Sequence, residues 1–196
     1  MEKIFAVISG LLALTASPPY ILDILRHKTK PQRMTWLIFT TLGVIALISQ
    51  WSLGATWSLV FLALDAAASL LVLLLSLKHG VGGHTNMDKV ALGIAGLGAV
   101  ISLLEGRPLV ALLGVIIADL AGFSLTIRKT YLEPGSETAI SWILFGLASL
   151  FGALAVGGWK LDLLIYPLYV AAVCFAVPLV QLLGTRNRSD RSPIKS

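Results

Sequence analysis

The chain has 196 residues, of which 57% are hydrophobic and 13% are charged, and its mean hydropathy is +0.88. That apolar content exceeds what one soluble domain needs to fill its core, so many apolar side chains must face lipid or other helices. The formal net charge of +5 is spread over short segments without interleaved aromatic residues. This pattern disfavours nucleic-acid binding.

Seven runs that are nearly free of charge predict seven transmembrane α-helices. Each run is about 15 to 22 residues long, which crosses a hydrocarbon core of roughly 30 Å. They are Ile4–Leu25, Met34–Leu53, Thr56–Leu77, Val90–Leu104, Pro108–Ile127, Thr138–Gly157 and Leu163–Leu183. The first run continues past Pro18-Pro19, so we interpret it as a span and not as a cleaved signal peptide. The expected fold class is therefore an all-α integral membrane protein.

The basic residues predict the orientation of these spans. When alternate loops are assigned to opposite sides, 12 of the 15 Lys and Arg residues lie on one side. The positive-inside rule then places the amino terminus outside and the carboxyl terminus in the cytosol. We expect the cytoplasmic membrane of a prokaryote, with segment 26–30 touching anionic lipid headgroups. The tail 185–196 is polar and basic, and we expect it to be disordered.

An internal repeat is visible at an offset of 103 residues. Residues 19–31 match 122–134, so that Tyr20 pairs with Phe123, and after three extra residues 35–39 match 141–145. This predicts two parallel three-helix repeats, 1–80 and 107–184, joined by a loop and a linker helix at 81–106. The alternative is a chance likeness between apolar helices.

A proline late in the first helix, the Lys28-Thr29 pair that follows and the 3+1+3 plan resemble the PQ-loop superfamily, which includes the SWEET sugar facilitators. The resemblance covers roughly residues 4 to 183 in architecture. It implies a carrier or facilitator for a small polar solute that works by alternating access. Because the superfamily also includes the KDEL receptor, a non-transporting receptor or assembly factor is the alternative.

Two acidic residues lie deep within predicted spans. Asp65 and Asp119 fall at about 13 and 17 Å from the outer ends of their helices. An ionised Asp at a helix centre costs roughly 2.5–3.5 kcal/mol, so neither should face lipid. We expect them to line a polar cavity between helices 56–77 and 108–127, where they would bind a cation, a solute amine or protons. The alternative is a protonated Asp that is hydrogen-bonded to a neighbouring helix.

Pro19 and Gly122 are equivalent positions of the two repeats, about two-thirds of the way through their helices. A proline removes one backbone hydrogen bond and kinks its helix, whereas a glycine permits bending or close packing. These two residues are therefore candidate hinges. Kinks that serve packing alone would explain them equally well.

Three more residues lie near the cytosolic boundary. Asp23 precedes Arg26 and His27 by three and four positions, which favours a helix-end ion pair over a gate. Trp36 and Trp142 are also equivalent repeat positions. Anchoring in the interfacial belt is the first interpretation of both, and a cytosolic gate is the second.

No enzyme, cofactor or metal is expected. His79 and His84 share a glycine-rich loop that does not fix ligands in place, and the only cysteine, Cys174, excludes an internal disulfide. No serine nucleophile elbow or zinc motif occurs. The expected partners are the lipid bilayer and a small solute, and a homo-oligomer is left open.

Overall fold

The computed structural model describes residues 2–52, 57–104, 108–156 and 161–191, and within them the fold is all-α. Seven α-helices follow one another along the chain: α1 Glu2–Leu25, α2 Arg33–Ser52, α3 Trp57–His79, α4 Asn86–Leu104, α5 Pro108–Leu132, α6 Ala139–Leu154 and α7 Leu161–Arg191. A short 3-10 helix, η1 Pro134–Ser136, lies between α5 and α6. The expected all-α class and the seven helices are confirmed.

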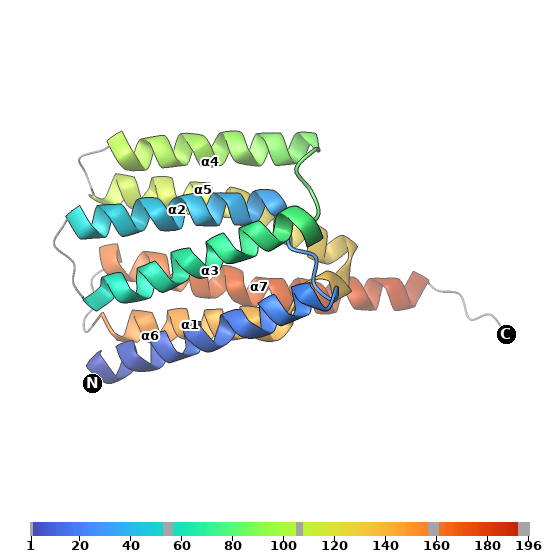
Figure 1. The fold of residues 1–196 in the computed structure, drawn as a ribbon, viewed down its shortest axis with the longest axis horizontal. Helices are drawn as coiled ribbons and strands as arrows, with labels where there is room; N and C mark the ends of the chain where they lie inside the picture. The colour runs from blue at the N-terminus through green and yellow to red at the C-terminus, as the bar shows by residue number, and fades with distance from the viewer. Residues whose placement is uncertain (1, 53–56, 105–107, 157–160, 192–196) are drawn as a thin grey trace.

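The helix boundaries agree with the expected ones to within a few residues, except near the carboxyl terminus. We expected disorder from Thr185, but α7 continues to Arg191, and residues 192–196 lie outside the described part. At Gly184 the helix packs closely on α5 and η1, because a Cβ placed there would lie 2.8 Å from Pro134 and 2.9 Å from the Tyr131 carbonyl oxygen. Beyond this point α7 projects past the other helices (Figure 1), and Thr185 and Arg186 are exposed.

Contacts between neighbouring helices place six of them in a ring. In order around the ring, α1 packs against α3, α3 against α2, α2 against α5, α5 against α7, α7 against α6, and α6 against α1. The remaining helix, α4, lies outside the ring on α5 and α2. In each triplet, α1–α3 and α5–α7, the third helix therefore lies between the first and the second.

The two triplets run in the same direction (Figure 1). α1, α3, α5 and α7 run one way along the bundle, and α2, α4 and α6 run back. Loops 26–32, 80–85 and 133–138 all lie at one end, together with basic residues such as Arg26, Lys30 and Arg33. We call it the basic end.

Much of the helix surface is apolar. On α1 the exposed large side chains Ile4, Val7, Leu11 and Leu14 recur at helical spacing. Two segments, 2–25 and 164–186, are long and apolar enough to cross a membrane, and shorter apolar helices cover 33–45, 66–79 and 139–154. Only 11% and 22% of the two longer segments are buried, unlike the core helices of a soluble protein. α1 also packs against α3 and α6, so it is part of the fold.

Candidate functional site

Five aromatic side chains form a closed circuit of contacts inside the six-helix ring. Their ring centroids are separated by 5.2 Å for Tyr20–Trp36, 5.8 Å for Trp36–Phe39, 4.7 Å for Phe39–Phe123, 5.5 Å for Phe123–Trp142 and 6.3 Å for Trp142–Tyr20. All these separations fall within the range of favourable aromatic pairs. We call these five residues the aromatic cluster. It joins α1 and α2 of the first triplet to α5 and α6 of the second.

The two tryptophans of the cluster are core residues. Trp36 and Trp142 are 7% and 4% exposed, and both lie near the start of their helices at the basic end. The indole N–H of Trp36 donates to the Tyr20 hydroxyl at 3.3 Å. The belt-anchor interpretation of both tryptophans is therefore wrong, because an interfacial anchor keeps its indole at the membrane surface.

A small void lies beside the aromatic cluster. Its lining residues are Ser17, Tyr20, Trp36, Ala68, Ser69, Val72 and Phe145, and it holds roughly one water molecule. These side chains come from α1, α2, α3 and α6.

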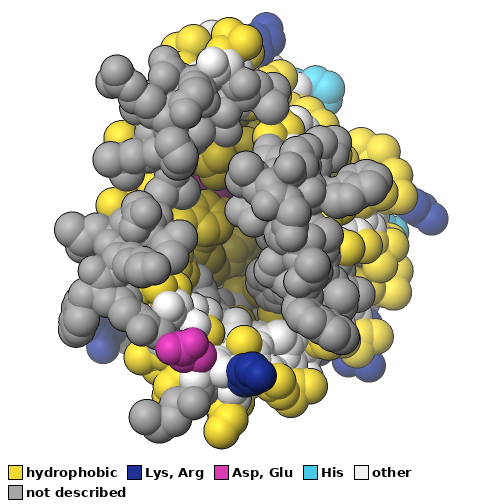
Figure 2. All heavy atoms as spheres, turned by 90° about the vertical axis from the view of Figure 1, so that its left-hand side faces the viewer, with side chains coloured by type: hydrophobic (Ala, Val, Ile, Leu, Met, Phe, Trp, Pro, Cys, Tyr) yellow, Lys and Arg dark blue, Asp and Glu magenta, His cyan; other side chains and the backbone are white. Residues whose placement is uncertain are grey.

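Figure 2 views the opposite end of the bundle. The described side chains visible near its centre are largely hydrophobic, and an acidic side chain is visible among them. Asp119 precedes Phe123 by one helical turn on α5, which places it about 6 Å further from the basic end. It is 7% exposed, and it interacts with the buried hydroxyl of Tyr169 on α7.

The second expected acid, Asp65, belongs to α3, but its side chain lies outside the described residues. We expected a cavity between the third and fifth helices. Among the described residues α3 and α5 do not touch, because α2 separates them in the six-helix ring. A site shared by the two acids would therefore span the central space and would not lie at one helix interface.

The two candidate hinges both adjoin the aromatic cluster. Pro19 lies inside α1, directly before Tyr20. Gly122 directly precedes Phe123, and a Cβ there would lie 3.1 Å from Phe39 and 3.3 Å from Ile38. The glycine thus permits close packing of α5 on α2, whereas hinge motion stays a prediction for both residues.

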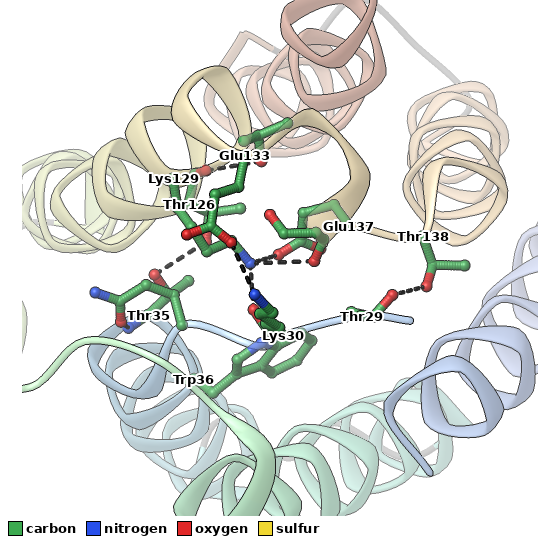
Figure 3. Close-up of polar contacts among 12 residues, drawn as sticks. Thr29, Lys30, Thr35, Trp36, Thr126, Lys129, Glu133, Glu137 and Thr138 are labelled. Carbon is green, nitrogen blue, oxygen red and sulfur yellow. Dashed lines mark hydrogen bonds and ion pairs between the residues drawn. The ribbon is translucent and has the colours of Figure 1, made fainter. Parts of the chain in front are cut away.

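A polar layer lies between the aromatic cluster and the basic end (Figure 3). The Thr138 hydroxyl donates to the Asp23 carboxylate at 3.0 Å, and Thr138 and Thr29 share a further hydrogen bond. The expected ion pair of Asp23 with Arg26 or His27 is wrong. In the described residues these basic side chains form no ion pair with Asp23, which accepts from the other triplet instead.

Lys129 and Glu137 form a buried ion pair in this layer (Figure 3). The Lys129 ammonium group also donates to the carbonyl oxygens of Lys30 and Ser136. The other carboxylate oxygen of Glu137 accepts from the Trp142 indole at 2.8 Å. From the sequence, Lys129 was considered only as one of the basic residues that predict orientation, and Glu137 was not considered at all. Both lie near the three residues inserted into the second repeat, and this insertion could have indicated a local contact there.

A second polar cluster joins the α1–α2 loop to the start of α4. Asp88 accepts hydrogen bonds from Thr85 and the Gly83 backbone, and the Gln32 amide donates to it at 2.6 Å. Burial raises the pKa of Asp88, but these hydrogen bonds outweigh burial and leave the pKa below its usual value. These contacts cap α4 and hold the loop. Within the described ranges, no three potential metal ligands lie together.

Comparison with models of known protein families, with curated protein sequences and with solved structures finds no match for this chain.

Proposed function

We propose that this chain is an integral membrane carrier or facilitator that moves a small polar solute by alternating access. In this proposal its seven helices cross the bilayer, with the amino terminus outside and the basic end in the cytosol. In the proposal the aromatic cluster is the cytosolic gate, here closed, and the opposite end of the bundle is the outer entrance. The observation that carries the proposal is the position of the cluster, in which rings of both triplets meet inside the six-helix ring.

The arrangement of helices supports an origin by duplication. Exchanging α1 with α5, α2 with α6 and α3 with α7 turns each contact of the six-helix ring into another contact of the same ring. Tyr20 and Phe123, and likewise Trp36 and Trp142, are equivalent repeat positions that meet in one cluster. Parallel repeats with a site between them are a recurring plan of transporters, which perform alternating access by rocking one half against the other.

The charges inside the predicted spans favour a solute with a positively charged group. The seven apolar runs contain Asp23, Asp65 and Asp119, and no Lys, Arg or His. In the proposal Asp119 binds the solute above the aromatic cluster, with Tyr169 beside it. The sequence puts Asp65 at about 13 Å and Asp119 at about 17 Å from the outer ends of their predicted spans, which is nearly the same depth. Asp65 is therefore the proposed second acid of the site.

The apolar surface supports placement in a bilayer. Exposed leucines occur along α1, α3, α4, α5 and α7, where they would contact lipid. The basic end would contact the anionic headgroups of the cytosolic leaflet. We propose the cytoplasmic membrane of a prokaryote as the location.

Transport is tested with purified protein in proteoliposomes. Primary amines, quaternary ammonium compounds, neutral sugars and carboxylates are compared for uptake and for thermal stabilisation. We expect uptake of a cationic member, reduced about tenfold or more in Asp119→Asn, because one lost charge interaction is worth about 1.4 kcal/mol or more. The control is Glu133→Gln, which changes an exposed acid at the basic end.

Uptake that is equal in Asp119→Asn and the native protein would remove Asp119 from the site. Thermal stabilisation by a solute without any uptake would support the receptor instead, and neither effect with any solute would contradict the carrier.

A further inference from the structure

We infer that Lys129 and Glu137 form a latch that holds the aromatic gate closed by fixing Trp142 and by binding the first triplet to the second. The inference rests on the proposed function, because it assigns positioning residues to the proposed cytosolic gate. Neither residue lies in the cluster itself.

Lys129 is bonded to both triplets at once. Its ammonium group donates to the Lys30 carbonyl oxygen in the α1–α2 loop and to the Ser136 carbonyl oxygen in η1, and it pairs with Glu137. The Lys30 backbone N–H also donates to the Ser136 carbonyl oxygen at 3.0 Å. Separating the two triplets at this end would therefore take the Lys30 carbonyl oxygen away from the Lys129 ammonium group, whereas Ser136 and Glu137 belong to the same triplet as Lys129.

Glu137 connects Lys129 to Trp142 of the aromatic cluster. Its side chain is fully buried, and its two carboxylate oxygens accept from Lys129 and from the Trp142 indole. The Gln181 amide of α7 donates to its carbonyl oxygen at 3.3 Å. The position of the Trp142 indole in the aromatic cluster is thus coupled to the ion pair.

The chemistry of a buried ion pair suits a site that becomes hydrated when the gate opens. Apolar side chains of similar volume often stabilise a permanently closed core as well as an ion pair does, or better. Lys129 and Glu137 belong to the same triplet, and water entering from the cytosol can rehydrate both charges once Lys129 leaves the Lys30 carbonyl oxygen. Removing one partner alone leaves the other charge buried without its counter-ion, which favours the hydrated, open arrangement.

The exposed ion pair Lys30–Glu133 provides a matched control. Its nitrogen and oxygen lie 3.1 Å apart, and it joins the same two loops. Both side chains are half exposed, so water already screens the pair and its loss should have little effect.

Cys174 is a native reporter of the gate. It is the only cysteine of the chain, it is 3% exposed, and it belongs to the same core cluster as Tyr20, Trp36 and Trp142. A thiol in this position is protected while the gate is closed and becomes reachable from the cytosolic side when the gate opens.

The test measures labelling of Cys174 by a membrane-impermeant maleimide, applied separately to each side of oriented vesicles. We expect Glu137→Gln and Lys129→Met to raise the labelling rate from the basic side about tenfold or more, with little change from the opposite side. Lys30→Met and Glu133→Gln should label like the native protein. Trp142→Phe, which removes the indole donor to Glu137 and also part of the ring packed against Tyr20 and Phe123, should increase labelling from the same side.

Native-like labelling in both Glu137→Gln and Trp142→Phe would overturn the latch, as would an equal increase from both sides. If one latch variant does not fold, the other, Glu137→Gln or Lys129→Met, decides the outcome against the matched controls Lys30→Met and Glu133→Gln. Solute uptake by the native protein separates the two proposals. If the native protein takes up a solute but the variants label like the native protein, only the latch proposal is contradicted. If the variants label faster but the native protein takes up no solute, only the carrier proposal is contradicted.

Discussion

The Thr35 hydroxyl donates a hydrogen bond of 2.7 Å to the main-chain carbonyl oxygen of Gly122, joining α2 of the first triplet to α5 of the second. The Thr126 hydroxyl in turn donates to Thr35 at 3.0 Å. Both threonine side chains are fully buried, next to the aromatic cluster. The carbonyl oxygen of Gly122, a predicted hinge residue, is thus hydrogen-bonded to the other triplet.

Replacing Thr35 by valine should destabilise the protein by about 1–3 kcal/mol, because the variant leaves the buried Thr126 donor without its acceptor. The measurement is thermal unfolding of the purified protein in detergent. Thr41→Val is the control, since Thr41 is exposed and its hydroxyl bonds only to Leu37 of its own helix. Equal losses of stability in the two variants would contradict the role of the Thr35 contacts.

The linker helix α4 should be sensitive to added volume at Gly98 and insensitive at Gly96. A Cβ at Gly98 would lie 2.4 Å from the Gly114 carbonyl oxygen of α5, whereas at Gly96 it would meet nothing within 4 Å. Gly98→Ala should therefore cost about 1–3 kcal/mol by forcing the helices apart. Gly96→Ala should be neutral or stabilising by up to about 1 kcal/mol, because alanine is the better helix former. Thermal unfolding of both variants distinguishes these outcomes.

Asp88 should make stability depend on pH in the acidic range. Its folded pKa lies below its usual value of 3.8, so its contribution is complete above that value and is lost as the pH falls through the folded pKa. Asp88→Asn should lower the free energy of unfolding by about 1–3 kcal/mol at pH 7. Both carboxylate oxygens of Asp88 accept hydrogen bonds, whereas the amide of asparagine has only one acceptor oxygen. The difference from the native protein should shrink when unfolding is measured near pH 3. A difference that stays constant between the two pH values would refute the linkage.

A charge on the outer face of α4 tests whether that face meets lipid. Leu97 is 62% exposed near the middle of α4, and Leu104 is exposed at its end. Leu97→Lys should oppose membrane insertion by about 2.5–3.5 kcal/mol, whereas Leu104→Lys should cost far less because its ammonium group reaches the interface. The measurement is the fraction of chains inserted into membrane vesicles. Equal insertion of both variants would mean that this face of α4 does not meet lipid.

The sequence predicted the elements well because the length of an apolar run and its flanking charges are local properties. The seven helices appear where the charge-free runs are, and α1 and α4 end at the residues expected. Lys30 and Glu133, which the offset of 103 aligns with each other, form an ion pair that the sequence did not predict.

Only the tertiary structure decided which face of each helix is buried and which helices meet. From the sequence, Asp23 was assigned to its own helix end and Trp36 and Trp142 to the interface. In the structure Asp23 and Trp142 contact the other triplet, and Trp36 packs against Tyr20 in the core. The physical reason is that apolar side chains can cover both the packed face and the outer face of such helices, so periodicity does not distinguish them. The contact of Lys129 with the Lys30 carbonyl oxygen, 99 positions away, depends on the order of helices in the six-helix ring, which no local pattern encodes.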